Sequence, residues 1–148
     1  MKSEEPAAPV KGMNILRFLA PFFIVLIVAV FVANILTHGS IEHPGKTVYD
    51  NRCAMCHGKE GEGIKVLVPP LKDADFARQN FDSIPCWIKN GMTRPITVNG
   101  ANYEQNMFGI ELDEVQTANV INYISRDLLK SDRRINSEWV KGRLRECK

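Results

Sequence analysis

One long apolar run lies near the N-terminus of the chain. No charged side chain occurs between Phe18 and Ile41, and the stretch FLAPFFIVLIVAVFVANIL at 18–36 is interrupted only by Pro21 and Asn34. A helix of this length spans about 28 Å at 1.5 Å per residue, close to the hydrocarbon thickness of a bilayer. A proline in the first turn of a helix is tolerated, because the N–H it lacks has no partner there. The pattern predicts a transmembrane helix over residues 18–36.

A cleaved signal peptide is the alternative interpretation of this run. Its apolar core would be shorter, and small residues would stand three residues and one residue before the cut. A cut after Ala33 would instead place Phe31 three residues before it. We therefore interpret the run as a single membrane anchor. Lys2, Lys11 and Arg17 precede it, which favours a cytoplasmic N-terminus.

The anchor divides the chain into parts of different composition. Residues 1–17 are a polar arm, and residues 37–45, THGSIEHPG, are a linker with turn residues. Residues 46–148 are then one domain of about a hundred residues with a basic C-terminal extension.

The pattern within residues 46–148 is that of a helical domain. Four segments predict helices: 46–58, closed by Gly58, then 82–91, 112–129 and 137–147. Two long loops separate them, at 59–76 and 93–110. We expect an all-α fold, with a single N-terminal transmembrane helix and about four helices in the domain.

Several helix ends carry capping residues. Asp113 and Gln116 match the capping-box pattern, Asp82 or Ser83 can cap the second helix, and Asn136 can cap the last. A small domain with two long loops buries little apolar surface by itself. We therefore expect a large buried group at its centre.

The stretch NRCAMCHG holds the candidate chemistry. Its C-x-x-C-H pattern is typical of the attachment site of c-type haem. Two thiols three residues apart on a helix lie on one face, where each can form a thioether with one vinyl group of the porphyrin. The adjacent imidazole can bind the iron. The motif predicts one haem c, attached to Cys53 and Cys56, with His57 as an axial iron ligand.

Such a motif also suits a zinc site, a dithiol redox centre or a structural disulfide. A four-cysteine zinc site has two close pairs, whereas the other two cysteines, Cys86 and Cys147, are far apart in the sequence. A thioredoxin-type dithiol expects a βαβ setting, which the pattern lacks. We therefore favour haem.

The sixth iron ligand is less defined by the sequence. His38 and His43 lie in the linker, and we interpret them as ordinary loop histidines. Of the methionines beyond the anchor and outside the motif, Met92 and Met107 remain. Spacing favours Met107 slightly, with Met92 as runner-up, and either can be a core residue.

Residues 45 to about 145 resemble class I cytochrome c, in particular the bacterial membrane-anchored monohaem type. The resemblance rests on GKTVYDNRCAMCHG, VPPL, PITVNGANYEQNM and LDEVQTANVINYI, which occur in the order of that family. It implies that Met107 is the distal iron ligand. It also implies that the carbonyl of Pro69 accepts a hydrogen bond from the His57 ring, which would orient the imidazole.

The resemblance also assigns packing roles and shows two departures. Leu71 would pack on the haem, and Tyr49 and Tyr123 would pair where the first and last helices cross. The family usually has proline after the distal methionine and an aliphatic residue in the last helix, where this chain has Phe108 and Thr117.

His/Met ligation implies one-electron transfer without catalytic residues or a small-molecule substrate. Haem attachment outside the cytoplasmic membrane, which the family implies, places the domain on the periplasmic side of a bacterial inner membrane. Disulfides form there, and we hypothesise a Cys86–Cys147 bond. Closing a loop of that size contributes on the order of 4 kcal/mol in the chain-entropy model.

The expected function is that of a tethered electron carrier in a respiratory chain. Its partners would be a quinol-oxidising complex or dehydrogenase and a terminal oxidase or reductase. One alternative is a permanent haem c subunit of a larger respiratory complex. A haem sensor or small peroxidase is less favoured, because no acid–base residues are evident near the distal side.

The net charge of +2 gives no support for nucleic-acid binding, and we interpret the basic C-terminal segment as a solvated helix face.

Overall fold

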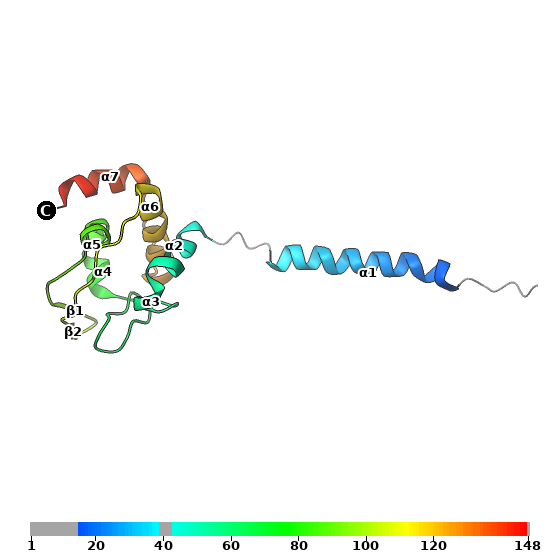
Figure 1. Cartoon of the computed structure of the whole chain (residues 1–148), viewed down its shortest axis with the longest axis horizontal. Coiled ribbons are helices and arrows are strands. Elements are labelled where there is room, and N and C mark those ends of the chain that lie inside the picture. The colour runs from blue at the N-terminus through cyan, green and yellow to red at the C-terminus, as the bar shows by residue number, and fades with distance from the viewer. Residues whose placement is uncertain (1–14, 39–42, 148) are drawn as a thin grey trace, which may run out of the picture. The chain divides into compact units, whose positions relative to one another are not determined.

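The structure, a computed structural model, describes residues 15–38 and 43–147, and Figure 1 shows its elements. The described residues divide into two compact units, one holding the N-terminal helix and the other every described residue from His43 on. Residues 1–14 of the expected arm and 39–42 of the expected linker lie outside the described residues.

The N-terminal helix α1 spans Ile15–His38 and includes the whole predicted span 18–36. Its 24 residues extend over about 36 Å. Because α1 begins at Ile15, Pro21 lies in its second turn rather than in the predicted first turn. Among the described residues, α1 is the one helix long and apolar enough to cross a membrane, and the side chains of Leu19–Leu36 are exposed. A signal sequence meets the same criteria.

In the second unit, the helices α2 (Pro44–Arg52) and α6 (Glu114–Tyr123) pack closely against each other. A Cβ atom at Gly45 would lie 1.9 Å from the carbonyl oxygen of Asn119, so this approach requires glycine. The rings of Tyr49 and Tyr123 meet at the same crossing, with 5.2 Å between centroids. This crossing holds the start of the second unit, just before the C-x-x-C-H motif, against α6.

The helix predicted over 46–58 is two helices in the structure. After α2 the chain bends at Cys53, and α3 spans Ala54–His57. Gly58 ends α3 with φ 80°, a conformation that favours glycine, as the sequence predicts.

The expectation of an all-α fold is wrong in one respect. Strands β1 (Ile96–Val98) and β2 (Ala101–Tyr103) form an antiparallel hairpin inside the segment expected to be a loop. The two residues between the strands, Asn99 and Gly100, have φ of 51° and 80°. Two positive φ values are typical of the type I′ turn, which matches the twist of the strands.

The other expected loop, 59–76, also ends in regular structure. Helix α4 covers Asp75–Gln79, and a 3₁₀ turn follows at Phe81–Ser83. The backbone N–H of Asp75 donates to the Asn99 side chain over 3.1 Å, and the Asn99 N–H donates to the Asp75 carboxylate over 2.7 Å. These bonds attach α4 to the hairpin.

Helix α5 spans Ile84–Asn90 and ends at Gly91, as predicted, with φ 76°. Ser83 occupies its N-cap position, but its side chain makes no capping hydrogen bond, so the predicted side-chain cap is wrong at this residue. Pro85 lies in the first turn, where its missing N–H is tolerated.

The predicted caps of the last two helices are confirmed. Asp113 accepts a hydrogen bond from the Gln116 N–H over 2.7 Å, and the Gln116 side chain accepts one from the Asp113 N–H over 3.2 Å, which completes the capping box of α6. Helix α7 spans Ser137–Glu146, and the Asn136 side chain accepts a hydrogen bond from Trp139 N–H over 2.9 Å.

The C-terminal segment is attached to the domain by polar bonds. Helix α6 continues into a π-helical turn at Ile124–Leu128, in which the buried Ser125 donates to the carbonyl of Arg133 over 2.8 Å. Asn122 makes two hydrogen bonds with the backbone of Ile135, over 2.8 and 2.9 Å. These bonds turn the chain back so that α7 packs against both α5 and α6.

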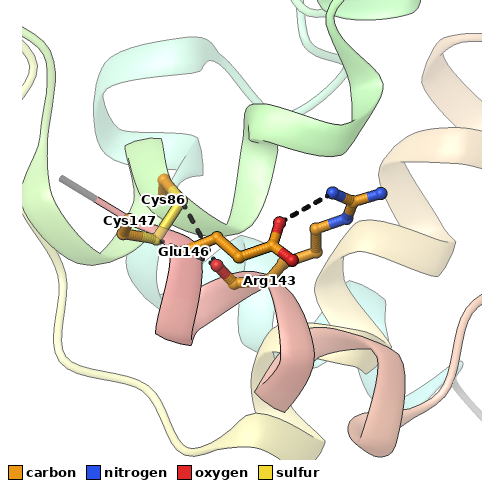
Figure 2. The surroundings of a disulfide bond; sticks show 4 residues. All are labelled: Cys86, Arg143, Glu146 and Cys147. Atoms are coloured by element: carbon orange, nitrogen blue, oxygen red, sulfur yellow. Dashed lines mark hydrogen bonds and ion pairs between the residues drawn. A yellow bond between two sulfur atoms is a disulfide. The ribbon is translucent and has the colours of Figure 1, made fainter.

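A disulfide joins Cys86 on α5 to Cys147 just after α7, and Figure 2 shows its surroundings. Both sulfur atoms lie near the carbonyl oxygen of Arg143, at 3.8 and 3.5 Å. The Arg143 guanidinium pairs with Glu146 over 2.9 Å and with Asp82 over 3.2 Å. The end of α7 is therefore held to α5 by a covalent bond, and to the 3₁₀ turn before α5 by the Arg143–Asp82 ion pair.

Candidate functional site

The second unit encloses a cavity of about 360 Å³ between α3, α5 and the β1–β2 hairpin. This volume is within the range of roughly 300–1,000 Å³ that is usual for cofactor and ligand sites. Most of its wall is apolar, and the bulky side chains that line it include Leu71, Phe76, Ile84, Trp87, Ile88, Val98 and Ile110. The cavity therefore suits a large, mainly apolar group.

All three residues of the C-x-x-C-H motif line this cavity. Cys53 lies at the bend between α2 and α3 and is partly buried, whereas Cys56 on α3 is exposed. His57, the last residue of α3, is buried. Cys53 and the short α3 thus place two thiols and one imidazole around the same space, as the haem prediction requires.

Pro69 lies beside the ring of His57. The distance between His57 Nδ1 and the Pro69 carbonyl oxygen is 3.1 Å, and a protonated Nδ1 donates to that oxygen. Nε2 is then the ring nitrogen available to a metal. Burial lowers the pKa of His57, although the hydrogen bond to Pro69 acts in the opposite direction. The imidazole is therefore neutral at pH 7, the form that binds metals.

The Cys53 thiol has the wrong property for a dithiol oxidoreductase. Burial, and secondarily the neighbouring Cys56, raises the pKa of Cys53 to about 11. Reactive cysteines in such enzymes have a lowered pKa, because the thiolate is the nucleophile. The structure joins Cys86 to Cys147 but leaves Cys53 and Cys56 as free thiols. The raised pKa of Cys53 disfavours the dithiol interpretation, and the free thiols give no support to a structural disulfide within the motif.

Met92 and Met107, the two candidates for the sixth ligand, are neighbours in the structure. Both line the cavity, and their backbones form an antiparallel bridge. Met92 N–H donates to the Met107 carbonyl over 2.8 Å, and Met107 N–H donates to the Met92 carbonyl over 2.9 Å. The geometry therefore supplies a thioether to the cavity from either residue.

Glycines allow the Met107 segment to lie against the end of α5. A Cβ atom at Gly91 would be 2.3 Å from the Met107 carbonyl oxygen, and one at Gly109 would be 2.4 Å from the Lys89 carbonyl oxygen. Ile110 N–H also donates to the Ile88 carbonyl over 2.6 Å. Helix α5 is thus the support that positions the methionine segment.

We expect Gly91→Ala to lower the free energy of unfolding by roughly 1–3 kcal/mol, because alanine is strained at positive φ and meets the Met107 carbonyl. Gly142→Ala is the matched control: a Cβ there meets nothing within 4 Å, and the change should stabilise α7 by about 0.5–1 kcal/mol. Denaturant unfolding of both variants measures this. Equal effects of the two changes would contradict the role given to Gly91.

The remaining predicted site residues surround the cavity or the motif. Leu71 lines the cavity, and its N–H donates to the Gly61 carbonyl over 2.8 Å. Tyr49 is fully buried, does not line the cavity, and donates its hydroxyl hydrogen to the Gly58 carbonyl over 2.8 Å. Tyr123 packs on Tyr49 away from the cavity wall. The tyrosine pair therefore stabilises the end of the C-x-x-C-H motif from outside the cavity.

Burial raises the pKa of Tyr49 well above its usual value, so its neutral form is favoured in the folded state. This stabilisation is fully present below the unfolded-state pKa of about 10 and is lost as the pH rises above it. We expect Tyr49→Phe to unfold about 1 kcal/mol more easily at pH 7, through loss of the bond to Gly58. Above pH 10 its unfolding free energy should fall less than that of the wild type. Parallel pH profiles of the two proteins in denaturant titrations would contradict this.

The two departures from the family pattern have different settings. Thr117 is buried, and its hydroxyl donates to the Asp113 carbonyl over 2.8 Å. Its polar atom is satisfied within its own helix, so threonine can replace an aliphatic residue there. Phe108 lines the mouth of the cavity and is 85% exposed.

Several cavity residues were not predicted from the sequence. Phe76 and Trp87 stack with 5.2 Å between ring centroids, and Val98 and Tyr103 come from the unpredicted hairpin. In ITVNGANY, apolar and polar residues alternate. This alternation is a strand signal that could have identified Val98 and Tyr103.

The residues present fit a covalently bound haem. Two thiols, a neutral imidazole and a choice of thioethers face an apolar cavity, and Arg52 and Arg94 are the charged residues among those that line it. Two cations suit a group that carries carboxylates. Within residues 15–38 and 43–147, no three His, Cys, Asp or Glu side chains form a metal-binding group, so the zinc interpretation has no support there.

Comparison with protein families gives a match to the family model described as Cytochrome c, over residues 43–126. The match covers more than half of the 148 residues and includes the C-x-x-C-H motif, Pro69, Met92 and Met107. It ends before the disulfide-bonded C-terminal helix α7. Comparison with curated proteins gives no match.

Proposed function

Because the chain belongs to the cytochrome c family, whose members bind haem c and transfer electrons, we propose that it is a membrane-anchored class I cytochrome with a single haem and His/Met ligation. One observation carries this proposal: Cys53, Cys56, His57 and Met107 all line one apolar cavity. When bound, haem c supplies an iron that changes its charge by one electron.

Each of these side chains has a separate task. Cys53 and Cys56 would hold the group through two thioethers. His57 would bind the iron through Nε2, while the Pro69 carbonyl fixes the ring through Nδ1. Met107 would supply a thioether ligand, and sulfur ligation of this kind raises the reduction potential relative to two histidines.

The cavity and the proposed iron ligands suit electron transfer rather than catalysis at iron. With His57 and Met107 both bound, the iron would have no free position for a substrate. The wall is apolar and packed on α5, which excludes water and limits reorganisation when the charge changes. Cys56 is exposed, so the attached edge of the group would lie near the surface, where an electron can enter or leave.

Membrane anchoring is the second part of the proposal. Helix α1 has the length and composition of a membrane span, and its side chains from Leu19 to Leu36 are exposed. A tether raises the local concentration of the haem domain near membrane-bound partners. We place the haem domain on the periplasmic side of a bacterial inner membrane, between a quinol-oxidising complex or dehydrogenase and a terminal oxidase or reductase.

A native gel of mildly solubilised membranes, stained for haem, tests this proposal. The haem of this chain should be in the membrane fraction and should run alone, near the mass of one chain with detergent. Haem in the soluble fraction would contradict the anchor. A band in a large assembly would contradict the free carrier and favour a permanent subunit of a respiratory complex, whose other chains mass spectrometry would identify.

A further inference from the structure

The geometry points to Met92 as a second iron ligand: we propose that its thioether takes the sixth position when Met107 leaves it. This inference rests on the proposed His/Met ligation. It assigns a role to a residue that would otherwise be a packing side chain, which is the commoner use of methionine.

The first argument is the register of the two residues. Met92 and Met107 exchange both backbone hydrogen bonds, over 2.8 and 2.9 Å, so they stand directly opposite each other. Residues directly opposite in an antiparallel pair point to the same face, with Cβ atoms about 4.5–5.5 Å apart. A site within reach of one thioether is therefore within reach of the other.

The second argument is the shared surroundings. Both methionines line the cavity that His57 lines, and both are partly buried. Methionine has three rotatable bonds and a polarisable sulfur, so its reach adapts without movement of the backbone. Neither side chain carries a proton that ligation must remove.

The third argument is the rigidity of the backbone beneath the pair. The bond from Ile110 to Ile88 and the close approaches at Gly91 and Gly109 fix both segments to the end of α5. Exchange of ligands then requires only side-chain rotation. One iron–sulfur bond breaks and another forms, and no electron or proton moves.

The experiment compares the haem-loaded full chain in detergent with the variants M107L, M107A, M92L and M92L/M107L. The oxidised spectrum reports a methionine–iron bond through its weak far-red band, and the reduced protein labelled with ¹³C-methyl methionine reports which methyl group lies over the haem. Covalent haem content and circular dichroism show that each variant has folded.

We expect the band in the wild type, in M92L and in M107L, with a different ligated methyl resonance in M107L, and its loss only in the double variant. Imidazole should bind readily to the double variant alone. If M107L already lacks the band and binds imidazole as the double variant does, the inference is overturned. Failure of both M107L and M107A to retain a closed haem site would also overturn it, since a competent second ligand would keep the site closed.

The same set separates this inference from the proposed function. A wild type without the far-red band would contradict His/Met ligation itself. A wild type with the band, together with an M107L variant without it, would contradict only the role of Met92.

Discussion

Replacing Cys53 and Cys56 together with serine is expected to abolish covalent haem attachment completely. A serine hydroxyl does not form the thioether, so no haem should remain on the denatured chain. The fold should also be destabilised, because without the haem the apolar side chains that line the cavity lose the group they would pack against.

Haem staining of a denaturing gel and the intact mass of the chain measure this prediction. Met55→Leu is the matched control, because Met55 lies between the two cysteines and is 91% exposed. That variant should keep its haem and its stability. Haem-sized mass on the denatured double-serine chain would show that the group is attached elsewhere.

Removing the Cys86–Cys147 disulfide with two serines is expected to lower the free energy of unfolding by about 4 kcal/mol, the chain-entropy value for a loop of this size. For a domain of about a hundred residues, this corresponds to a fall in Tm of roughly 15–30 °C. The bond closes a separation of 61 residues and attaches α7 to α5. Its loss leaves the Arg143–Asp82 ion pair to hold the helix end, and an exposed pair contributes little.

Thermal unfolding of the variant and of the wild type measures this effect. Wild-type protein treated with a phosphine reductant is the comparison, and it should unfold at the temperature of the variant. An unchanged Tm in both samples would mean that the polar bonds of Ser125 and Asn122 already hold the C-terminal segment.

Features encoded over a few residues were predicted well. The C-x-x-C-H motif needs one turn of helix, and the capping box of α6 and the glycine ends of α3 and α5 depend on neighbours within four residues. The glycine ends of α3 and α5 and the N-caps of α6 and α7 were predicted because these signals are local, whereas the short helix α4 was missed. The bend at Cys53 was not predicted, because helical pattern continues through that residue.

The β1–β2 hairpin was missed although its signal is local. Asn99 and Gly100 form the strongest short hairpin sequence, but the strands are only three residues long, and the surrounding glycine, proline and asparagine residues indicated a loop. The bonds between Asp75 and Asn99 stabilise the hairpin, and they join residues 24 positions apart. Pattern analysis within a short window does not detect such a pair.

The distal side depends on tertiary structure for the same reason. Spacing left Met92 and Met107 as alternatives, since nothing in the sequence shows that the two segments are paired on the end of α5. Likewise, the hydrogen bond from the Ser125 hydroxyl to the Arg133 carbonyl, which attaches the C-terminal segment, forms only when the chain folds through the π-helical turn. The sequence therefore predicted the residues of the C-x-x-C-H motif. The structure adds the cavity wall formed by α5, the hairpin and the paired methionine segments.

The central claim is that this chain holds one haem with histidine and methionine ligands and transfers single electrons. A redox titration of the purified full chain in detergent, followed by its optical spectrum, tests it most directly. The account predicts one haem per chain, a single one-electron transition, and a weak far-red band in the oxidised form that is unchanged by added imidazole. A chain without that band, whose iron binds imidazole readily, would contradict the account and indicate an open site suited to sensing or catalysis.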